Sequence, residues 1–188
     1  MGAHWGATDT LWEDFQHPDG QVRPLSHLHP LTFVVSLPAI KNRQSLDVSV
    51  TVGFALHTFT RDGVAGDDLR LVYPAYREDR LFDELRYRLS LSLPDIVRSL
   101  EGRKCFENPS QNYLTVELTD IDGVASEYRI FFLVQRWKEE CRRTGLHCVR
   151  LIVQSAFPVN AEIPRPRASH RQPIGFRVIL SRALRLGK

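Results

Sequence analysis

Three strand-like segments follow one another between Tyr113 and Ser155. Residues 113–118 alternate apolar and polar side chains, residues 128–134 are nearly all apolar or aromatic, and residues 149–155 are again rich in β-branched side chains. These patterns are typical of β-strands. Short connections favour antiparallel pairing, because a parallel pair needs a long crossover. We therefore expect an antiparallel meander of at least three strands.

Two more strands are predicted in the N-terminal half. Leu31–Leu37 is apolar and β-branched, and Leu46–Phe59 alternates clearly between apolar and small polar side chains. Residues 79–101 show helical spacing, with Asp79 as a possible N-cap and Pro94 at the start of a second helix. The sequence thus predicts an α+β fold: an antiparallel sheet, with N-terminal strands added to the meander, and two short helices packed on one face.

The length of 188 residues favours one domain with extended ends. Residues 1–30 have no clear period and are expected to form an N-terminal arm, in which Leu11–Phe15 has the composition of a short helix. Residues 31–188 form the predicted single α+β domain, with a Pro/Arg-rich loop at 158–173 that the prolines keep irregular. Ile174–Leu180 is predicted as a last strand, and Lys138–Gly145 fits either a loop or a helical turn.

The apolar segments are far shorter than the ~20 residues that cross a bilayer, so no membrane span is predicted. The N-terminal residues lack the basic start and apolar stretch of a secretory signal, and a cytoplasmic location is expected. Three cysteines are too few and odd in number for a disulfide framework, so we expect reduced thiols. The spacing of Cys141 and Cys148, with His147 beside the second, matches no common zinc motif.

Familiar catalytic signatures are absent from the sequence. It contains no GxGxxG, P-loop, GxSxG, HExxH or CxxC motif, which argues against nucleotide-dependent enzymes, nucleophile-elbow hydrolases and zincins. Residues 113–119 resemble the strand of PD-(D/E)xK nucleases, yet Thr119 occupies the position of the lysine that those enzymes use. We therefore predict neither a metal site nor a cofactor.

The charges are distributed very unevenly along the chain. Residues 129–188 contain 13 of the 25 Lys and Arg residues and 3 of the 22 Asp and Glu residues, for a formal charge of +10. Residues 1–128 contain 12 basic and 19 acidic residues, for −7. Arginine dominates the basic set, and its planar fork suits phosphate and carboxylate partners. The asymmetry predicts a polyanionic or acidic protein partner, unless these arginines are neutralised by the acidic part of the same chain.

The predicted order of two helices followed by a three-stranded meander, over residues 79–157, resembles that of RelE/ParE-type toxins. That resemblance implies metal-independent cleavage of RNA, or action on gyrase, from a basic sheet face, and neutralisation by a cognate antitoxin. The matching residues are Arg129 and Arg136 on the middle strand and Arg150 on the third. The chain departs from the family in its length, in its N-terminal strands and in having Phe157 where a tyrosine is expected.

Metal-free RNA cleavage needs a base, cations on the scissile phosphate and an acid for the leaving oxygen. We nominate His57, Arg61 and Arg129 for these catalytic roles, with a structural, hydrogen-bonded His57 as the alternative. The residues nominated for nucleic-acid binding are Arg136, Arg150, Arg165, Arg167 and Arg171.

The sequence leaves two functional hypotheses. The first is a small basic protein that binds nucleic acid, with RNA favoured, such as a ribonuclease-type toxin or defence factor of a bacterial or phage element. The second is a non-enzymatic adaptor that binds an acidic protein through its basic C-terminal part. Pairing of the acidic part of one copy with the basic part of another also allows a homodimer.

Overall fold

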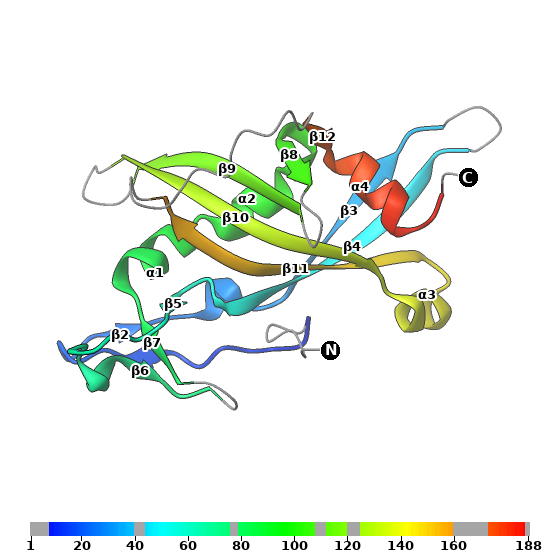
Figure 1. The fold of residues 1–188 in the computed structure, drawn as a ribbon. Helices are drawn as coiled ribbons and strands as arrows, with labels where there is room; N and C mark the ends of the chain where they lie inside the picture. The colour runs from blue at the N-terminus through cyan, green and yellow to red at the C-terminus, as the bar shows by residue number, and fades with distance from the viewer. Residues whose placement is uncertain are drawn as a thin grey trace.

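A computed structural model describes residues 8–39, 44–75, 79–107, 112–119, 125–159 and 173–186. Its main feature is a seven-stranded, strongly twisted sheet with the strand order β12-β8-β9-β10-β11-β4-β3 (Figure 1). Short helices pack against this sheet, and a smaller group of strands extends from one end of it. The predicted α+β fold is confirmed.

The centre of the sheet is formed by the predicted meander. Strands β9 (Asn112–Thr119), β10 (Ala125–Arg136) and β11 (His147–Pro158) pair antiparallel in sequence order. Beyond β11 the sheet continues with β4 (Leu46–His57), which runs parallel to β11. The sheet is therefore mixed rather than antiparallel throughout. The long chain segment between β4 and β11, which holds the helices and the first part of the meander, provides the crossover that parallel pairing requires.

The remaining strands of the large sheet lie toward its two edges. β3 (Leu31–Leu37), which the apolar pattern predicts as a strand, pairs antiparallel with β4 and forms one edge. On the other side, β8 (Lys104–Glu107) pairs with β9, and the two-residue β12 (Ile174–Gly175) pairs with β8.

Five two- or three-residue strands make up the smaller group. β5 (Thr60–Arg61), β6 (Val72–Tyr73) and β7 (Arg80–Phe82) form a three-stranded antiparallel sheet. β1 (Phe15–Gln16) and β2 (Val22–Arg23) form a hairpin. Two 3-10 turns, η1 (Ser26–Leu28) and η2 (Leu69–Leu71), complete this region.

Aromatic side chains pack these short strands together. Phe15 stacks on Phe82 with ring centroids 4.4 Å apart, and Phe59 meets Tyr73 edge to face at 5.0 Å. The segment Leu11–Phe15 forms no helix; instead, the indole N–H of Trp12 donates to the carbonyl of Phe54 at 2.9 Å. These long-range contacts hold the N-terminal arm against the end of β4. They determine the structure of the arm more strongly than the weak local sequence pattern of Leu11–Phe15 does.

The two predicted helices are present, and the first begins later than expected. α1 spans Glu84–Ser90, and its N-cap is Asp83, whose carboxylate accepts the backbone N–H of Arg86 at 2.8 Å. Asp79 is not the cap, because the next residues belong to β7. α2 (Leu93–Arg98) follows at once and ends in the 3-10 turn η3 (Leu100–Gly102).

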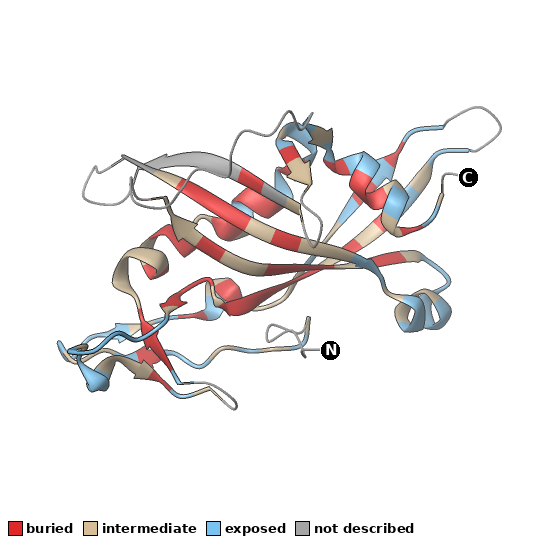
Figure 2. Cartoon of the chain, in the orientation of Figure 1, coloured by how far each residue is buried: buried red, intermediate tan, exposed pale blue. Residues whose placement is uncertain are grey.

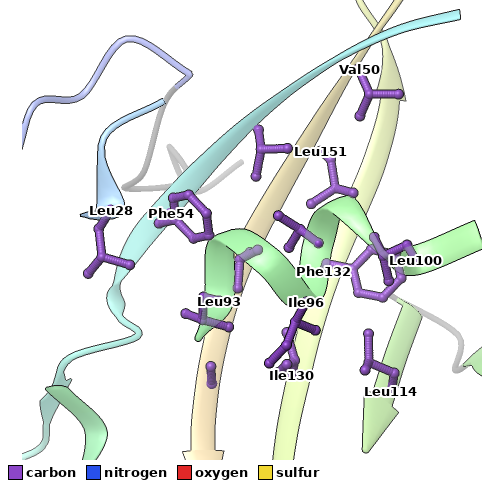
Figure 3. Packing of buried hydrophobic residues seen from close by; sticks show 14 of the residues in the cluster. Leu28, Val50, Phe54, Leu93, Ile96, Leu100, Leu114, Ile130, Phe132 and Leu151 are labelled. Carbon is purple, nitrogen blue, oxygen red and sulfur yellow. The ribbon is translucent and has the colours of Figure 1, made fainter. Parts of the chain in front are cut away.

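The main core lies between these helices and one face of the sheet. Alternate residues of β4, β10 and β11 point into it, as the period of two requires. Figure 3 shows the apolar side of α2 lying across the three strands. The fully or nearly fully buried side chains drawn and labelled there include Leu93, Ile96, Leu100, Phe54, Phe132 and Leu151. Residues of the N-terminal arm, Leu25 and Leu28 among them, are buried in the same core.

The predicted last strand is wrong over most of its length. Only Ile174 and Gly175 are extended, and Phe176–Ala183 forms helix α4. Phe176, Ile179 and Leu180 lie at i, i+3 and i+4 and are all buried, and Phe176 meets Phe132 of β10 edge to face. The β-branched residues of this segment favour a strand locally, but burial of one helical face against the sheet decides its structure.

Among the described residues, none of the helices has the length and hydrophobicity needed to cross a membrane.

Candidate anion-binding site

β10 and β11 are joined by a compact helical connection at one end of the sheet. β10 ends at Arg136, the backbone N–H of Trp137 donates to the carbonyl of Cys148 on β11 at 3.0 Å, and helix α3 (Lys138–Thr144) follows. Gly145 ends the helix with a φ of 73°, a left-handed conformation that favours glycine. Of the two structures that the sequence allowed for this segment, the helical one is present.

Three basic side chains surround a surface pocket at this connection. Arg136, Lys138 and Arg142 line it together with Cys141, and its volume is about 390 Å³. All three basic residues are exposed, and Figure 2 shows α3 as one of the most exposed helices of the molecule. Within the described part of the chain, no carboxylate pairs with any of the three. We refer to Arg136, Lys138 and Arg142 as the cationic corner.

Other arginines of the basic C-terminal part are neutralised by carboxylates. Arg177 lies 2.7 Å from Glu101, and Arg182 lies 2.6 Å from Glu107, so both pair with the acidic part of the chain. Arg143, next to the corner, forms a two-pronged pair with Glu140, which lowers the pKa of that carboxyl group. The cationic corner differs from these positions because its charge is not compensated by a described neighbour.

An aromatic residue and a further arginine lie at the same end of the sheet as the corner. The guanidinium of Arg150 on β11 lies 5.5 Å from the ring centroid of Trp137, within the range of a cation–π contact. Arg150 Nε is buried and has no hydrogen-bond partner among the described residues. Trp137 itself is partly exposed. Trp137 is adjacent in sequence to Arg136 and Lys138 but does not line the pocket. Arg150 pairs with Gln135, so its side chain lies on the opposite face of the sheet from Arg136.

The three residues nominated for catalysis lie toward the other end of the sheet. His57 ends β4, and its backbone carbonyl accepts a hydrogen bond from Arg86 Nη1 at 3.1 Å. Its strand partner on β11 is Ser155, while Arg129 on β10 pairs with Phe157, so β11 separates the histidine from this arginine.

Both nominated arginines are engaged with acidic side chains. Arg61 holds Asp67 with two hydrogen bonds of 2.6 and 2.8 Å and lies 3.6 Å from Asp83; the hydrogen bonds to Asp67 raise its pKa. Arg129 is only 4% exposed and pairs with Glu127 at 3.3 Å. Arg129 is therefore not presented to solvent, and the guanidinium of Arg61, although partly exposed, is already held by carboxylates.

The structure thus divides the nominated residues into two groups. Arg136 and Arg150 lie on adjacent strands, one pairing with Val149 and the other with Gln135, at the α3 end of the sheet. Arg136 and Arg129 are seven positions apart, which at about 3.3 Å per residue corresponds to roughly 23 Å along β10. Arg165, Arg167 and Arg171 lie outside the described residues. No cluster of potential metal ligands occurs in the described part of the chain.

Lys138 and Arg142 were not recognised as site residues from the sequence. They lie at i and i+4 of α3, which places them on the same side of the helix. That spacing is the signal that could have identified them, but it is meaningful only once the segment is known to be helical.

Comparisons with known proteins place the chain among related sequences. The YjaZ family model matches residues 14–184. Protein YjaZ of Escherichia coli (strain K12) is 28% identical over 155 residues, which cover 79% of this chain and 80% of that protein. No solved structure matches the chain.

Proposed function

This chain belongs to the YjaZ family, and we propose that it functions by binding RNA through the cationic corner. The family name specifies no activity, so the proposal rests on the surface of the molecule. The observation that carries it is the pocket lined by three basic side chains that no described carboxylate neutralises.

The arrangement of charge favours an anionic ligand. Like charges at i and i+4 of a helix repel each other and cost about 0.2–0.5 kcal/mol, so Lys138 and Arg142 do not stabilise α3 by themselves. A phosphate between them turns that repulsion into attraction and releases the counterions of the nucleic acid. Arg136 adds a planar fork that can form two hydrogen bonds to one phosphate group.

The aromatic neighbour favours RNA over an acidic protein as the partner. Single-stranded nucleic acids are commonly held by a basic surface that follows the backbone and by aromatic rings on which bases stack. Trp137, partly exposed and adjacent in sequence to two residues of the corner, supplies such a ring. The carboxylate side chains of an acidic protein have no flat aromatic face that stacks on the indole as a base does.

The proposal is limited to binding. A ribonuclease that uses His57 together with Arg61 and Arg129 needs those guanidinium groups at the scissile phosphate, and both are instead paired with carboxylates. The nominated catalytic residues also lie far from the cationic corner along the sheet. Cleavage is therefore included in the experiment as a separate measurement.

The experiment measures binding of a fluorescent single-stranded RNA by anisotropy over a series of salt concentrations. Three phosphate contacts predict a slope of about −2 for log K against log salt, so affinity falls about twentyfold between 50 and 200 mM salt. The variant R136Q/K138Q/R142Q should lose most of the binding and most of the slope.

A second triple variant provides the matched control. R98Q/R177Q/R182Q removes the same formal charge from exposed positions that are already paired with Asp95, Glu101 and Glu107. If RNA affinity depends on net charge alone, both triple variants will lose the same affinity, and the proposed site is wrong. If no RNA binds at low salt while poly-L-glutamate does, an acidic protein is the partner instead.

The same RNA is analysed on a denaturing gel. Intact RNA in the presence of the folded protein agrees with a binding function. Cleavage that disappears in H57Q would establish the nuclease hypothesis in its place.

A further inference from the structure

Cys141 and Cys148 lie against each other at the connection between β10 and β11. The backbone N–H of Cys148 donates to Cys141 Sγ at 3.3 Å, and the Cys141 thiol lies 3.5 Å from the Cys148 carbonyl oxygen. Burial is the main cause that raises the pKa of Cys148, and the neighbouring Cys141 raises it further. The turn at Gly145 brings together two cysteines that are seven residues apart in sequence.

We propose that Cys141 and Cys148 form a redox-modification site, in which a hydroperoxide oxidises Cys141 and Cys148 then closes a reversible disulfide between α3 and β11. The geometry is compatible with this bond. A disulfide requires Cα atoms about 4.4–6.8 Å apart and a sulfur–sulfur distance of about 2.05 Å. A sulfur already 3.3 Å from the partner's backbone nitrogen reaches that arrangement mainly by side-chain rotation.

The two cysteines differ in their exposure to solvent, and we infer from this difference that Cys141 reacts first. Cys141 is partly exposed and lines the pocket of the cationic corner, so a small oxidant reaches its sulfur from solvent. Cys148 is 3% exposed and is shielded by α3. The hydroxyl of Thr144 lies 3.5 Å from Cys148 Sγ and offsets only part of the rise in pKa that burial causes, so Cys148 is the less reactive thiol and takes the second step.

The chemistry balances with one hydroperoxide. The Cys141 thiolate attacks one peroxide oxygen, an S–O bond forms, the O–O bond breaks, and the second oxygen leaves as hydroxide and is protonated to water. The Cys148 thiolate then attacks the Cys141 sulfur, an S–S bond forms, and the S–O bond breaks with release of a second water. Two thiols lose two electrons in total, and these reduce one hydrogen peroxide to two waters.

The third cysteine serves as an internal control. Cys105 lies on β8 with no exposed surface, and burial raises its pKa to about 11. It should neither react with the oxidant nor exchange with the pair. Recovery of Cys105 as an unreacted thiol therefore reports that the protein was folded during oxidation.

The experiment treats the full-length folded protein with hydrogen peroxide, blocks the remaining thiols and digests the product with trypsin without reduction. Cleavage after Lys138, Arg142, Arg143 and Arg150 leaves Cys141 in residues 139–142 and Cys148 in residues 144–150. We expect these two peptides to be linked, two hydrogens lighter than their sum, and to separate after addition of dithiothreitol. Cys105 should be recovered as a blocked thiol.

Variants test each step. C148S should form no link and should accumulate a sulfenic acid at Cys141 that dimedone traps, whereas C105S should form the link as the wild type does. In urea Cys105 becomes accessible, so wild-type protein oxidised there should also lose the blocked Cys105 thiol, a comparison that needs no variant to fold. The proposal is overturned if folded wild-type protein yields no linked peptide once Cys141 has been oxidised, or if Cys141 stays reduced, or if the cysteines pair in other combinations. None of these results depends on RNA binding.

Discussion

The helical docking of α4 can be tested at two neighbouring positions. In the structure Phe176 has no exposed surface, whereas Val178 is 45% exposed on the outer side of the same helix. Truncating a buried phenylalanine to alanine costs about 3–5 kcal/mol. Phe176→Ala should therefore lower the free energy of unfolding by that amount, a large part of the 5–15 kcal/mol typical of a domain. Val178→Ala should change it by less than about 0.5 kcal/mol.

The comparison distinguishes the helix from the strand that the local sequence favours. In a strand, residues 176, 178 and 180 share one face, so both truncations would be costly. Urea unfolding followed by far-UV circular dichroism gives both values. In addition, a double-mutant cycle with Phe132→Ala should show a coupling of about 0.5–1.5 kcal/mol, as expected for the edge-to-face contact at 6.5 Å. Equal losses for Phe176→Ala and Val178→Ala, or no coupling to Phe132, would refute the packing of α4 described above.

Two further predictions concern single polar groups. The Tyr128 hydroxyl is completely buried and has no hydrogen-bond partner among the described residues. Tyr128→Phe should therefore leave the urea midpoint unchanged or raise it, because the desolvation cost of about 1–3 kcal/mol disappears. A clear decrease in the midpoint would show that the hydroxyl has a hydrogen-bond partner. The Arg61 side chain and the Val64 N–H lower the pKa of Asp67 from 3.8 to about 2. The stabilisation by its carboxylate is therefore complete above pH 4 and is lost as the pH falls through 2. Asp67→Asn should lose less stability than the wild type between pH 4 and pH 2 in acid titrations followed by circular dichroism, and identical acid profiles would contradict this assignment.

Counting charges along the sequence predicts only part of the candidate site. The excess of basic residues after position 128 is a property of the sequence, but its meaning depends on which of them meet a carboxylate. Arg177 pairs with Glu101 and Arg182 pairs with Glu107, which lie 76 and 75 positions earlier in the chain. No local sequence pattern predicts such contacts. Lys138 and Arg142, on which the proposed function depends, lie on the same side of α3 only because this segment is helical.

The alternation of side chains along the chain was enough to predict the meander, the two N-terminal strands and the α+β class, because one buried face imposes a period of two wherever the sheet forms. Burial, however, depends on many residues at once, and it determines features of the fold that the local sequence pattern does not. The parallel pairing of β11 with β4, the helix at Phe176–Ala183 and the burial of Arg129 all depend on partners distant in sequence. The free energy of those contacts is gained only after the chain has folded, so only the tertiary structure shows them.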